Sequence, residues 1–528
     1  MQIELMGAAM VGQEAYESSI RLGLVIEADA PFEAWHERLL GELNALSGVR
    51  LVRIYLDAAP RPPVFMSALS FSAFRFDNLV TRRKGVEMRP DWRLAARAFA
   101  GPEEPDIVID LRAAANAVAG AAREVWSVDF LRGPASPERL GMRVAASGAG
   151  AFSIALERVT PAGFEQIDQA VCAGRRSAVR NLEQAEQVIA AMILRTLRAR
   201  IAGITNKTRE PFADGLVLQP ADDDHALLFA GKFVAYAAAR GADTLSKRIS
   251  AWSGTLAPHF KLYHATGTPL DFSPGAAQAL ADSGKNYLAD PFLFRQGGRL
   301  WAFFEIFDYR QNTGSIGVAE LTGNGLGPIE TVLSGGGHLS YPQVFAHGEE
   351  IYMMPECCAR RRVEIWRAVR FPYEWELAAT ALEGAIAVDS NLHFDGGKWW
   401  LITNVAFDPS IDAGLELSVF EADGPLLKNL AAHACNPVIA DARYARNGGR
   451  IFRQGGKLYR PAQSLEFGKY GYGLYIMEIL RLSHDEYEER PVRFIRGCHH
   501  LDSNGADIIF DMRRGVSLEQ AAQSGKPA

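Results

Sequence analysis

The strongest constraint on the fold is a segment that the C-terminal half of the sequence repeats four times. Each copy is an apolar strand that reaches a phenylalanine, a tight turn with glycine, and a second strand with an aromatic residue near its start. The copies occupy Asp290–Glu305, Tyr341–Glu356, Ser390–Asn404 and Gly448–Gln463. They recur about every 50 residues, and a strand–turn–strand unit at that period is the signature of a β-propeller blade.

The segments between the copies complete the predicted blades. Two further strand-like segments follow each copy, which makes four blades of four strands. Two apolar segments are left over, His259–Ala265 before the first blade and His499–Met512 after the last. Pairing them would close the ring and remove exposed sheet edges. We therefore expect a fifth blade that is built from both ends of the domain.

Polar residues recur at one register of the repeat. The first strands begin near Asp290, Tyr341, Asp389 and Arg450, and the second strands end at Glu305, Glu356, Asn404 and Gln463. In an antiparallel hairpin the start of one strand lies beside the end of the next. We therefore expect these side chains to surround one mouth of the propeller.

The first 250 residues predict a different architecture. Short apolar strands are expected at Ser19–Ala28, Arg50–Leu56 and Asp106–Leu111, with an amphipathic helix at Ala30–Leu46 between the first two. This spacing favours a parallel α/β sheet. A long amphipathic helix is expected at Arg176–Ile201. We place the domains at residues 1–250, an α/β domain with a helical tail, and 251–528, the propeller with a short C-terminal tail.

Composition narrows the possible partners. The 528 residues carry a net charge of −6, which argues against a nucleic-acid partner. The sequence contains no apolar run long enough for a transmembrane helix and no signal-peptide pattern. The five cysteines have no framework or metal-ligand spacing, so we expect reduced thiols, a cytoplasmic location, no metal and no cofactor.

Two segments of the repeat half resemble a known class of propellers. ADPFLF at Ala289–Phe294 and DSNLHFDGGKWWLITN at Asp389–Asn404 resemble motifs of five-bladed furanosidase-type propellers, the fold of arabinanases, β-xylosidases, invertases and levansucrases. The resemblance implies that Asp290 is the base or nucleophile. It also implies that Asp389 orients the substrate and tunes the acid.

A closer similarity covers nearly the whole repeat half. With ADPFLF and DSNLHFDGGKWWL, the segments HLSYPQVF, IYMMPE, GGRIFRQGGKLYRPAQ and YGYGLYIMEI are similar to the propeller domain at the N-terminus of plant glucosamine inositolphosphorylceramide transferases and to its bacterial relatives. The similarity implies the propeller fold and a role in surface-glycan or glycolipid metabolism. It specifies activity much less closely than fold.

The sequence departs from these families at two places. Furanosidase-type enzymes carry the acid as a glutamate in the fourth blade, but the stretch Asn436–Arg450 has none and offers Asp441, Arg443, Arg446 and Arg450 instead. An acid must then come from Glu356 or Glu466, or be absent. In addition, Ser464 stands where the relatives tend to carry an acid.

The first half faintly resembles a formyltransferase-type, Rossmann-like α/β domain. The matching stretch is Glu124–Gly133, where Ser127 and Asp129 stand in place of the Asn-x-His of formyltransferases. Without the histidine the site lacks its proton shuttle. The resemblance implies a degenerate domain that serves as scaffold or partner surface.

These observations predict a carbohydrate-active protein that transfers or hydrolyses a glycosyl group, acting like a glycoside hydrolase or beside a glycosyltransferase. The alternative is a non-catalytic module that binds a glycan or glycolipid for a partner glycosyltransferase, and an active formyltransferase on an amino sugar is the least favoured hypothesis. The expected ligand is a sugar, a nucleotide sugar or a glycolipid. The expected catalytic residues are Asp290, Glu356 and Asp389. The expected substrate-binding residues are Glu305, Tyr341, His393, Asn404, Arg450, Arg460 and Gln463. His499, His500 and Asp502 are assigned a structural role in the closing hairpin.

Overall fold

The structure is a computed structural model, and it describes residues 19–27, 34–57, 68–81, 99, 102–112, 124–130, 137–204, 229, 231–238, 259–280, 286–406 and 412–522. The chain forms two compact units. One holds most of the N-terminal half, and the other holds the chain from residue 231 onward with the short pieces Ser147–Phe152 and Val171–Arg176. The predicted boundary at residue 250 stays a prediction. No described helix is both long enough and apolar enough to cross a membrane.

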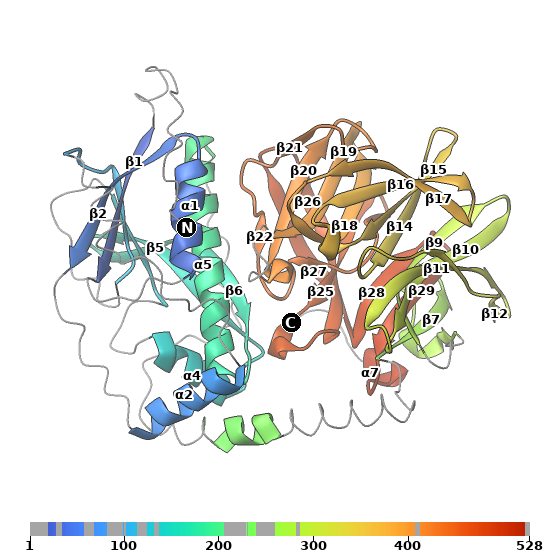
Figure 1. The fold of residues 1–528 in the computed structure, drawn as a ribbon, viewed down its shortest axis with the longest axis horizontal. Coiled ribbons are helices and arrows are strands. Elements are labelled where there is room, and N and C mark those ends of the chain that lie inside the picture. The colour runs from blue at the N-terminus through green and yellow to red at the C-terminus, as the bar shows by residue number, and fades with distance from the viewer. Residues whose placement is uncertain are drawn as a thin grey trace. The chain divides into compact units, whose positions relative to one another are not determined.

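The first unit is built around one six-stranded sheet in the order β2-β1-β3-β4-β5-β6 (Figure 1). Its strands are β1 (Ile20–Glu27), β2 (Val49–Asp57), β3 (Ile107–Asp110), β4 (Glu124–Val128), β5 (Ala151–Thr160) and β6 (Gly163–Ala173). The strands from β1 to β4 pair in parallel, as the strand–helix–strand spacing predicts, and β5 pairs with β4 in the antiparallel sense. The parallel sheet is thus confirmed, while the formyltransferase type stays a prediction.

The labelled helices of this unit, among the described residues, are α1 (Ala34–Ala45), α2 (Ala68–Thr81), α4 (Pro137–Ser147) and α5 (Ala178–Ile201). The long helix predicted at Arg176–Ile201 is α5, and the Ser177 side chain caps its first turn by accepting from the amide of Arg180. Nearly all of α5 is buried, including Arg195, whose guanidinium pairs with Asp168 at 2.5 Å. A buried pair of this kind satisfies both charges inside the unit.

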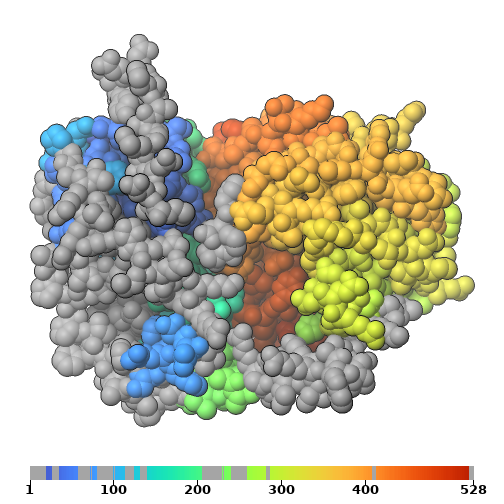
Figure 2. Space-filling model, viewed as in Figure 1, coloured from blue at the N-terminus to red at the C-terminus, as the bar shows by residue number. Residues whose placement is uncertain are grey.

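The second unit contains five sheets that correspond to the five predicted blades. Blade one is β9 (Tyr287–Gln296), β10 (Arg299–Asp308), β11 (Thr313–Thr322), β12 (Gly325–Leu326) and β13 (Glu330–Leu333). Blade two is β14 (Ser340–His347), β15 (Glu350–Glu356), β16 (Val363–Arg370) and β17 (Glu374–Ala381). Blade three is β18 (Ile386–Asp395), β19 (Lys398–Ala406), β20 (Glu416–Ala422), β21 (Leu430–Ala432) and β22 (Ile439–Ala440). In the space-filling view these three blades, yellow to orange, make up most of the visible surface of the unit (Figure 2).

The last two blades complete the ring. Blade four is β23 (Arg446–Asn447), β24 (Phe452–Gln454), β25 (Lys457–Ser464), β26 (Gly473–Leu482) and β27 (Tyr487–Arg496). Blade five combines β28 (Cys498–Ser503) and β29 (Asp507–Arg513) with β7 (Phe260–Thr266) and β8 (Gln278–Ala279). The antiparallel pairing of β29 with β7 joins the two ends of the domain, so the predicted fifth blade is confirmed.

Short helices connect or follow these strands: η2 (Pro274–Ala276), η3 (Cys358–Arg360), η4 (Ala413–Leu415), η5 (Glu466–Gly468) and α7 (Leu518–Ala522). The blades form a closed ring because their inner strands touch in sequence, β9 with β14, β14 with β18, β18 with β23, and β28 with both β25 and β9. Five apolar clusters fill the spaces between neighbouring blades. The repeated apolar strands therefore bury their side chains against the next blade, and the polar residues at the strand ends are left at the ring's inner edge.

Candidate functional site

The inner strands of three blades share an unusual backbone feature at the same register. Asp290, Tyr341 and Asp389 all lie in the left-handed region, with φ of 50°, 48° and 49°. At each of them the pairing with the second strand slips, which marks a β-bulge. In blade five the slip falls between Cys498 and His500 and makes His499 the equivalent residue. Bulges re-aim side chains and are strained for residues other than glycine, so the repeat places chosen side chains at one edge of the ring.

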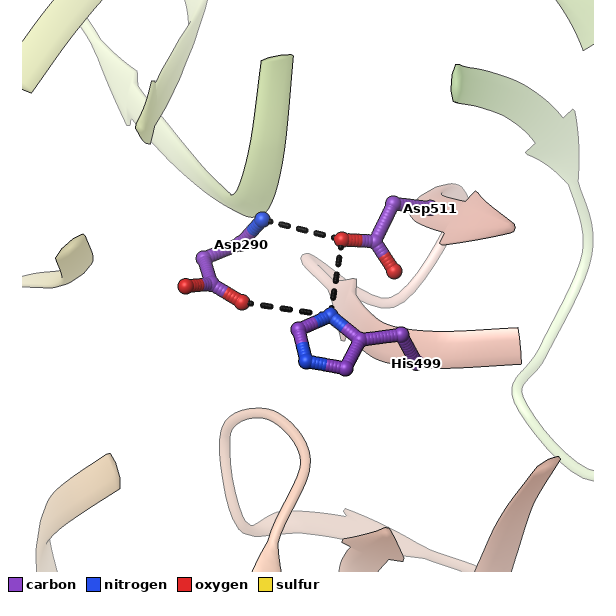
Figure 3. Close-up of side chains that lie close together, drawn as sticks. All are labelled: Asp290, His499 and Asp511. Atoms are coloured by element: carbon purple, nitrogen blue, oxygen red, sulfur yellow. Dashed lines mark hydrogen bonds and ion pairs between the residues drawn. The ribbon is translucent and has the colours of Figure 1, made fainter. Parts of the chain in front are cut away.

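The first group of polar side chains at this edge is Asp290, His499 and Asp511 (Figure 3). The Nδ1 atom of His499 lies 3.0 Å from Oδ2 of Asp511 and 3.4 Å from Oδ1 of Asp290. Oδ2 of Asp511 also accepts from the backbone amide of Asp290 at 3.0 Å. Burial alone would lower the pKa of His499, but Asp511 and Asp290 raise it above its ordinary value. The three ligand atoms lie within 4.8 Å of one another and could hold a metal ion, although a proton on Nδ1 also satisfies them.

The second group joins blades two, three and four. The Nε atom of Arg446 donates to Oδ2 of Asp389 at 2.6 Å, and the backbone amide of Asp389 donates to Oε2 of Glu356 at 2.9 Å. The thiol of Cys358 donates to Oε1 of the same glutamate at 3.3 Å. Gln463 extends the group, since its Nε2 lies 3.3 Å from Oδ2 of Asp389. Asp389 thus orients Glu356 through its main chain and Arg446 through its side chain.

Glu305 supplies a further carboxyl from the end of β10. Its side chain is buried, and Oε1 lies 3.4 Å from Nε2 of His338. Burial raises the pKa of Glu305 well above its ordinary value, and the charges of Asp290 and Glu356 raise it further. Glu305 is therefore protonated more readily than an exposed glutamate.

The carboxyls of the two groups act on one another electrostatically. Burial raises the pKa of Asp290 to about 8, and the charges of Asp511, Asp389 and Glu356 add to the rise while His499 opposes it. Burial raises the pKa of Glu356 to about 7, again with help from Asp389 and against Arg446. Carboxyls that hold a proton near neutral pH can both give and take one there. We call Asp290, Glu305, Glu356 and Asp389 the carboxylate cluster.

Tyr470 borders the cluster and was not found from the sequence. Its ring packs edge-on against His499 with centroids 4.6 Å apart, and the guanidinium of Arg446 lies 5.0 Å from its centroid. The residue is 42% exposed, so part of it is accessible to a ligand. It lies in the loop between β25 and β26, where no strand periodicity singles it out. An open aromatic ring beside carboxyls offers an apolar surface for a sugar.

The remaining predicted residues of this register hold the blades together. The hydroxyl of Tyr341 donates to the carbonyl of Gly449 at 3.1 Å and accepts from Asn391 at 2.8 Å. The amide nitrogen of Asn404 donates to the carbonyls of Glu416 and Ala445. Both side chains are buried, so their hydrogen bonds go to neighbouring strands.

Three predicted binding residues, Arg450, Arg460 and His393, lie apart from the cluster. Arg450 donates to Asp502 and to the carbonyls of Leu293 and Val344, and thereby ties three inner strands together. Arg460 is fully buried and binds Glu489, Asn447 and the carbonyl of Tyr444.

Burial lowers the pKa of the His393 imidazole to about 4, and the charges of Asp395, Arg453 and Arg450 have smaller effects on it. Glu466, the other proposed acid, accepts from Ser464 and Tyr475. Like Arg450 and Arg460, neither residue contacts the carboxylate cluster. Of the predicted site residues, the structure therefore brings together Asp290, Glu305, Glu356, Asp389 and Gln463.

Comparison with known sequences relates the propeller to one family. A family model described as "Glucosamine inositolphosphorylceramide transferase 1, N-terminal" matches residues 274–506. The rice protein of that name (Oryza sativa subsp. japonica) is 37% identical over 211 residues, which are 39% of this chain and 28% of the relative. The Arabidopsis thaliana protein is 36% identical over 213 residues, again 28% of its length. The predicted relationship to this propeller domain is confirmed, and the chain spans little more than a quarter of these relatives.

Comparison with solved structures returns sugar-cleaving enzymes of low similarity. A GH43 β-xylosidase/α-arabinofuranosidase from a compost microbial metagenome is 12% identical, with a TM-score of 0.33, and the match covers 46% of this chain and 89% of that enzyme. The propeller fold rests on the five sheets described above.

Proposed function

We propose that the propeller binds a sugar at the carboxylate cluster and transfers or hydrolyses its glycosyl group in surface-glycan or glycolipid metabolism. The observation that carries this proposal is the gathering of buried carboxyls at one edge of the ring, where burial and the charge of Asp389 raise the pKa of Asp290 to about 8 and that of Glu356 to about 7. Cleaving or forming a glycosidic bond needs one carboxyl that protonates the leaving oxygen and a second that attacks or activates water. The name of the rice relative, a transferase of glucosamine and inositolphosphorylceramide, supports the same class of substrate.

The members of the cluster have different proposed roles. Glu356 is the only one of the four that is not fully buried, so it is best placed to reach a leaving group. Asp290 is then the base or nucleophile, as its resemblance to the furanosidase-type motif implies. Asp389 positions Glu356 through its amide and does not itself need to react.

Which of the two carboxyls, Asp290 or Glu356, acts as the acid can be tested directly. Burial raises the pKa of both carboxyls to near neutrality, so either residue is able to hold the proton there. A sugar with an activated leaving group needs no acid. The variant that keeps turnover on such a substrate, D290N or E356Q, therefore identifies which residue is the acid.

The test of the proposal is turnover of a panel of glycosides and nucleotide sugars by the full chain and by D290N, E356Q and E466Q. We expect D290N and E356Q to lose turnover by at least about a hundredfold while D290N still binds sugar. E466Q should keep turnover, because Glu466 lies outside the cluster. Equal turnover by D290N and the unaltered chain would contradict the proposal.

One observation favours a second function, a non-catalytic module that presents a glycan or glycolipid to a partner glycosyltransferase. Arg446 stands in the blade-four stretch where the furanosidase-type resemblance calls for the acid. Sugar binding without turnover by the unaltered chain, with binding lost in Y470A, would establish this module. For an active formyltransferase, Asp129 offers little support, since its Oδ1 accepts from the amide of Ala155. An assay with a formyl donor and amino-sugar nucleotides tests that activity directly.

A further inference from the structure

Arg446 is a positive side chain at the carboxylate cluster that uses only part of its hydrogen-bonding capacity. Its Nε donates to Asp389, and no other described residue accepts a hydrogen bond from the guanidinium. The side chain is 18% exposed. Within the described part of the chain, its two terminal nitrogens are thus available to a ligand. In contrast, the guanidiniums of Arg450 and Arg460 are occupied by carboxylates and carbonyls.

The guanidinium is also held in one orientation. Asp389 accepts from its Nε at 2.6 Å, and its Cζ lies over the ring of Tyr470, 5.0 Å from the centroid. The Cδ of Arg446 lies 3.2 Å from the position that a Cβ on Gly414 would take, so a glycine makes room for the side chain there. A fixed planar fork with two free nitrogens matches the geometry of a carboxylate or a phosphate and loses little entropy on binding one.

The carboxyls around Arg446 do not repel an anion at neutral or lower pH. The titratable groups that face the guanidinium are Asp389 on β18, Glu356 on β15 and Tyr470 in the loop after β25. Asp389 is neutralised by the ion pair with Arg446 itself. Glu356 is half-protonated near pH 7, and the next carboxyl, Asp290 on β9, acts on Tyr470.

The titratable groups that contact Tyr470 and Glu356 carry no excess negative charge either. His499 on β28, which packs against Tyr470, has its charge balanced by Asp511 on β29. Cys358 on η3 keeps its proton, because burial and Glu356 raise the pKa of its thiol. Protonated carboxyls can themselves donate hydrogen bonds to an oxyanion.

We propose that Arg446 binds an oxyanion on the glycosyl ligand, so that the site takes a sugar that carries a phosphate or a carboxylate. The inference rests on the proposed function, because it names the substrate class of the same site. It also accounts for the absence of a glutamate from the fourth-blade stretch, since a cation there selects the ligand and leaves the proton chemistry to Asp290 and Glu356.

The experiment measures binding of matched sugars to the full chain by isothermal titration calorimetry at pH 6. One pair is methyl glucuronide and methyl glucoside, and the other is glucose 6-phosphate and glucose. We expect an anionic member to bind at least about tenfold more tightly than its neutral partner, the difference a charge-assisted hydrogen bond makes. The pair that shows the preference distinguishes a carboxylate from a phosphate. The preference should shrink from pH 6 to pH 9, as Glu356 beside Arg446 loses its proton.

Three variants locate the preference. R446Q should abolish it, and R446K, which keeps a positive charge beside Asp389 without the fork, should reduce it even if R446Q folds poorly. R443Q is the matched control, because Arg443 forms a pair with Asp441 in the same stretch and stacks on Tyr444 at 4.4 Å. R443Q should keep the preference.

Each outcome decides the inference. Equal binding of both members, or tighter binding of the neutral one, overturns the anion specificity and leaves the sugar site standing. A preference that survives in R446Q and R446K overturns the role of Arg446. If no sugar binds under any condition, the proposed function and this inference both fall.

Discussion

Replacing Asp290 with asparagine should stabilise the protein, and increasingly so as the pH rises. In the folded protein the pKa of Asp290 is about 8, against 3.8 for an exposed aspartate. Between those two values the unfolded chain carries the charge while the folded chain keeps the proton, so this residue makes folding less favourable as the pH rises. One pKa unit corresponds to about 1.4 kcal/mol. The effect of the native aspartate grows from pH 6 until it levels off near pH 8, the pKa in the folded protein. Between pH 6 and pH 9 the aspartate should therefore lower the unfolding free energy by about 3 kcal/mol.

The assay is urea denaturation of the full chain, followed by tryptophan fluorescence at pH 6, 7, 8 and 9. Asparagine tolerates the left-handed backbone of Asp290 as well as aspartate does, so D290N isolates the charge. We expect the stability of D290N relative to the unaltered chain to grow by about 3 kcal/mol over this range. S390A, which changes no charge beside the cluster, should show a difference that does not depend on pH. A difference for D290N that stays constant or shrinks at high pH would refute the argument.

Three further changes test other contacts of the site and the ring. C358A removes the thiol that donates to Glu356 and helps to lower the pKa of that carboxyl. The titration step near pH 7 in the pH profile of turnover or binding should therefore move to higher pH. A step at an unchanged pH would count against that contact. Y470A should weaken sugar binding by about tenfold, measured by calorimetry, if the open ring carries the sugar, and unchanged affinity would remove it from the site. R460M should lower the unfolding free energy by about 3–5 kcal/mol, because it leaves Glu489 buried without its partner. If R460M is as stable as the unaltered chain but binds sugar more weakly, Arg460 is a binding residue after all.

Most of the propeller could be predicted because its repeat expresses a physical requirement. Each blade must bury two faces against its neighbours, so the apolar strands recur at the same spacing in every copy. The same logic predicts that His259–Ala265 pairs with His499–Met512, as β7 and β29 do. The first half gave a parallel sheet for a similar reason, since short buried strands and an intervening helix leave few other arrangements.

The site could be predicted only in part, because register places a side chain at the mouth without saying what it binds there. Asp290 and Glu356 both belong to the carboxylate cluster, whereas Tyr341 and Asn404, at the same register, donate hydrogen bonds to backbone carbonyls of the propeller. A sequence does not distinguish these uses, since both need a polar side chain at a strand end. Arg450 is such a case, since it satisfies carbonyls of two other blades.

The residues whose role sequence analysis missed come from a loop, from a two-residue strand and from the closing blade. Tyr470 lies in the loop between β25 and β26, and Arg446, which the sequence offers without a role, lies in β23, which is too short for a periodic pattern to predict the direction of a side chain. His499 was expected to serve the closing hairpin alone, yet a bulge turns it toward Asp290. Only the three-dimensional closure of the ring brings these residues to one place.

The most direct test of the account is a crystal structure of the full chain with the tightest-binding anionic sugar of the matched pairs. The account predicts that the sugar ring lies on Tyr470, its oxyanion contacts the terminal nitrogens of Arg446, and its glycosidic oxygen lies within hydrogen-bond distance of Glu356 or Asp290. A sugar bound beside Arg450 and His393, or on the N-terminal sheet, would contradict it.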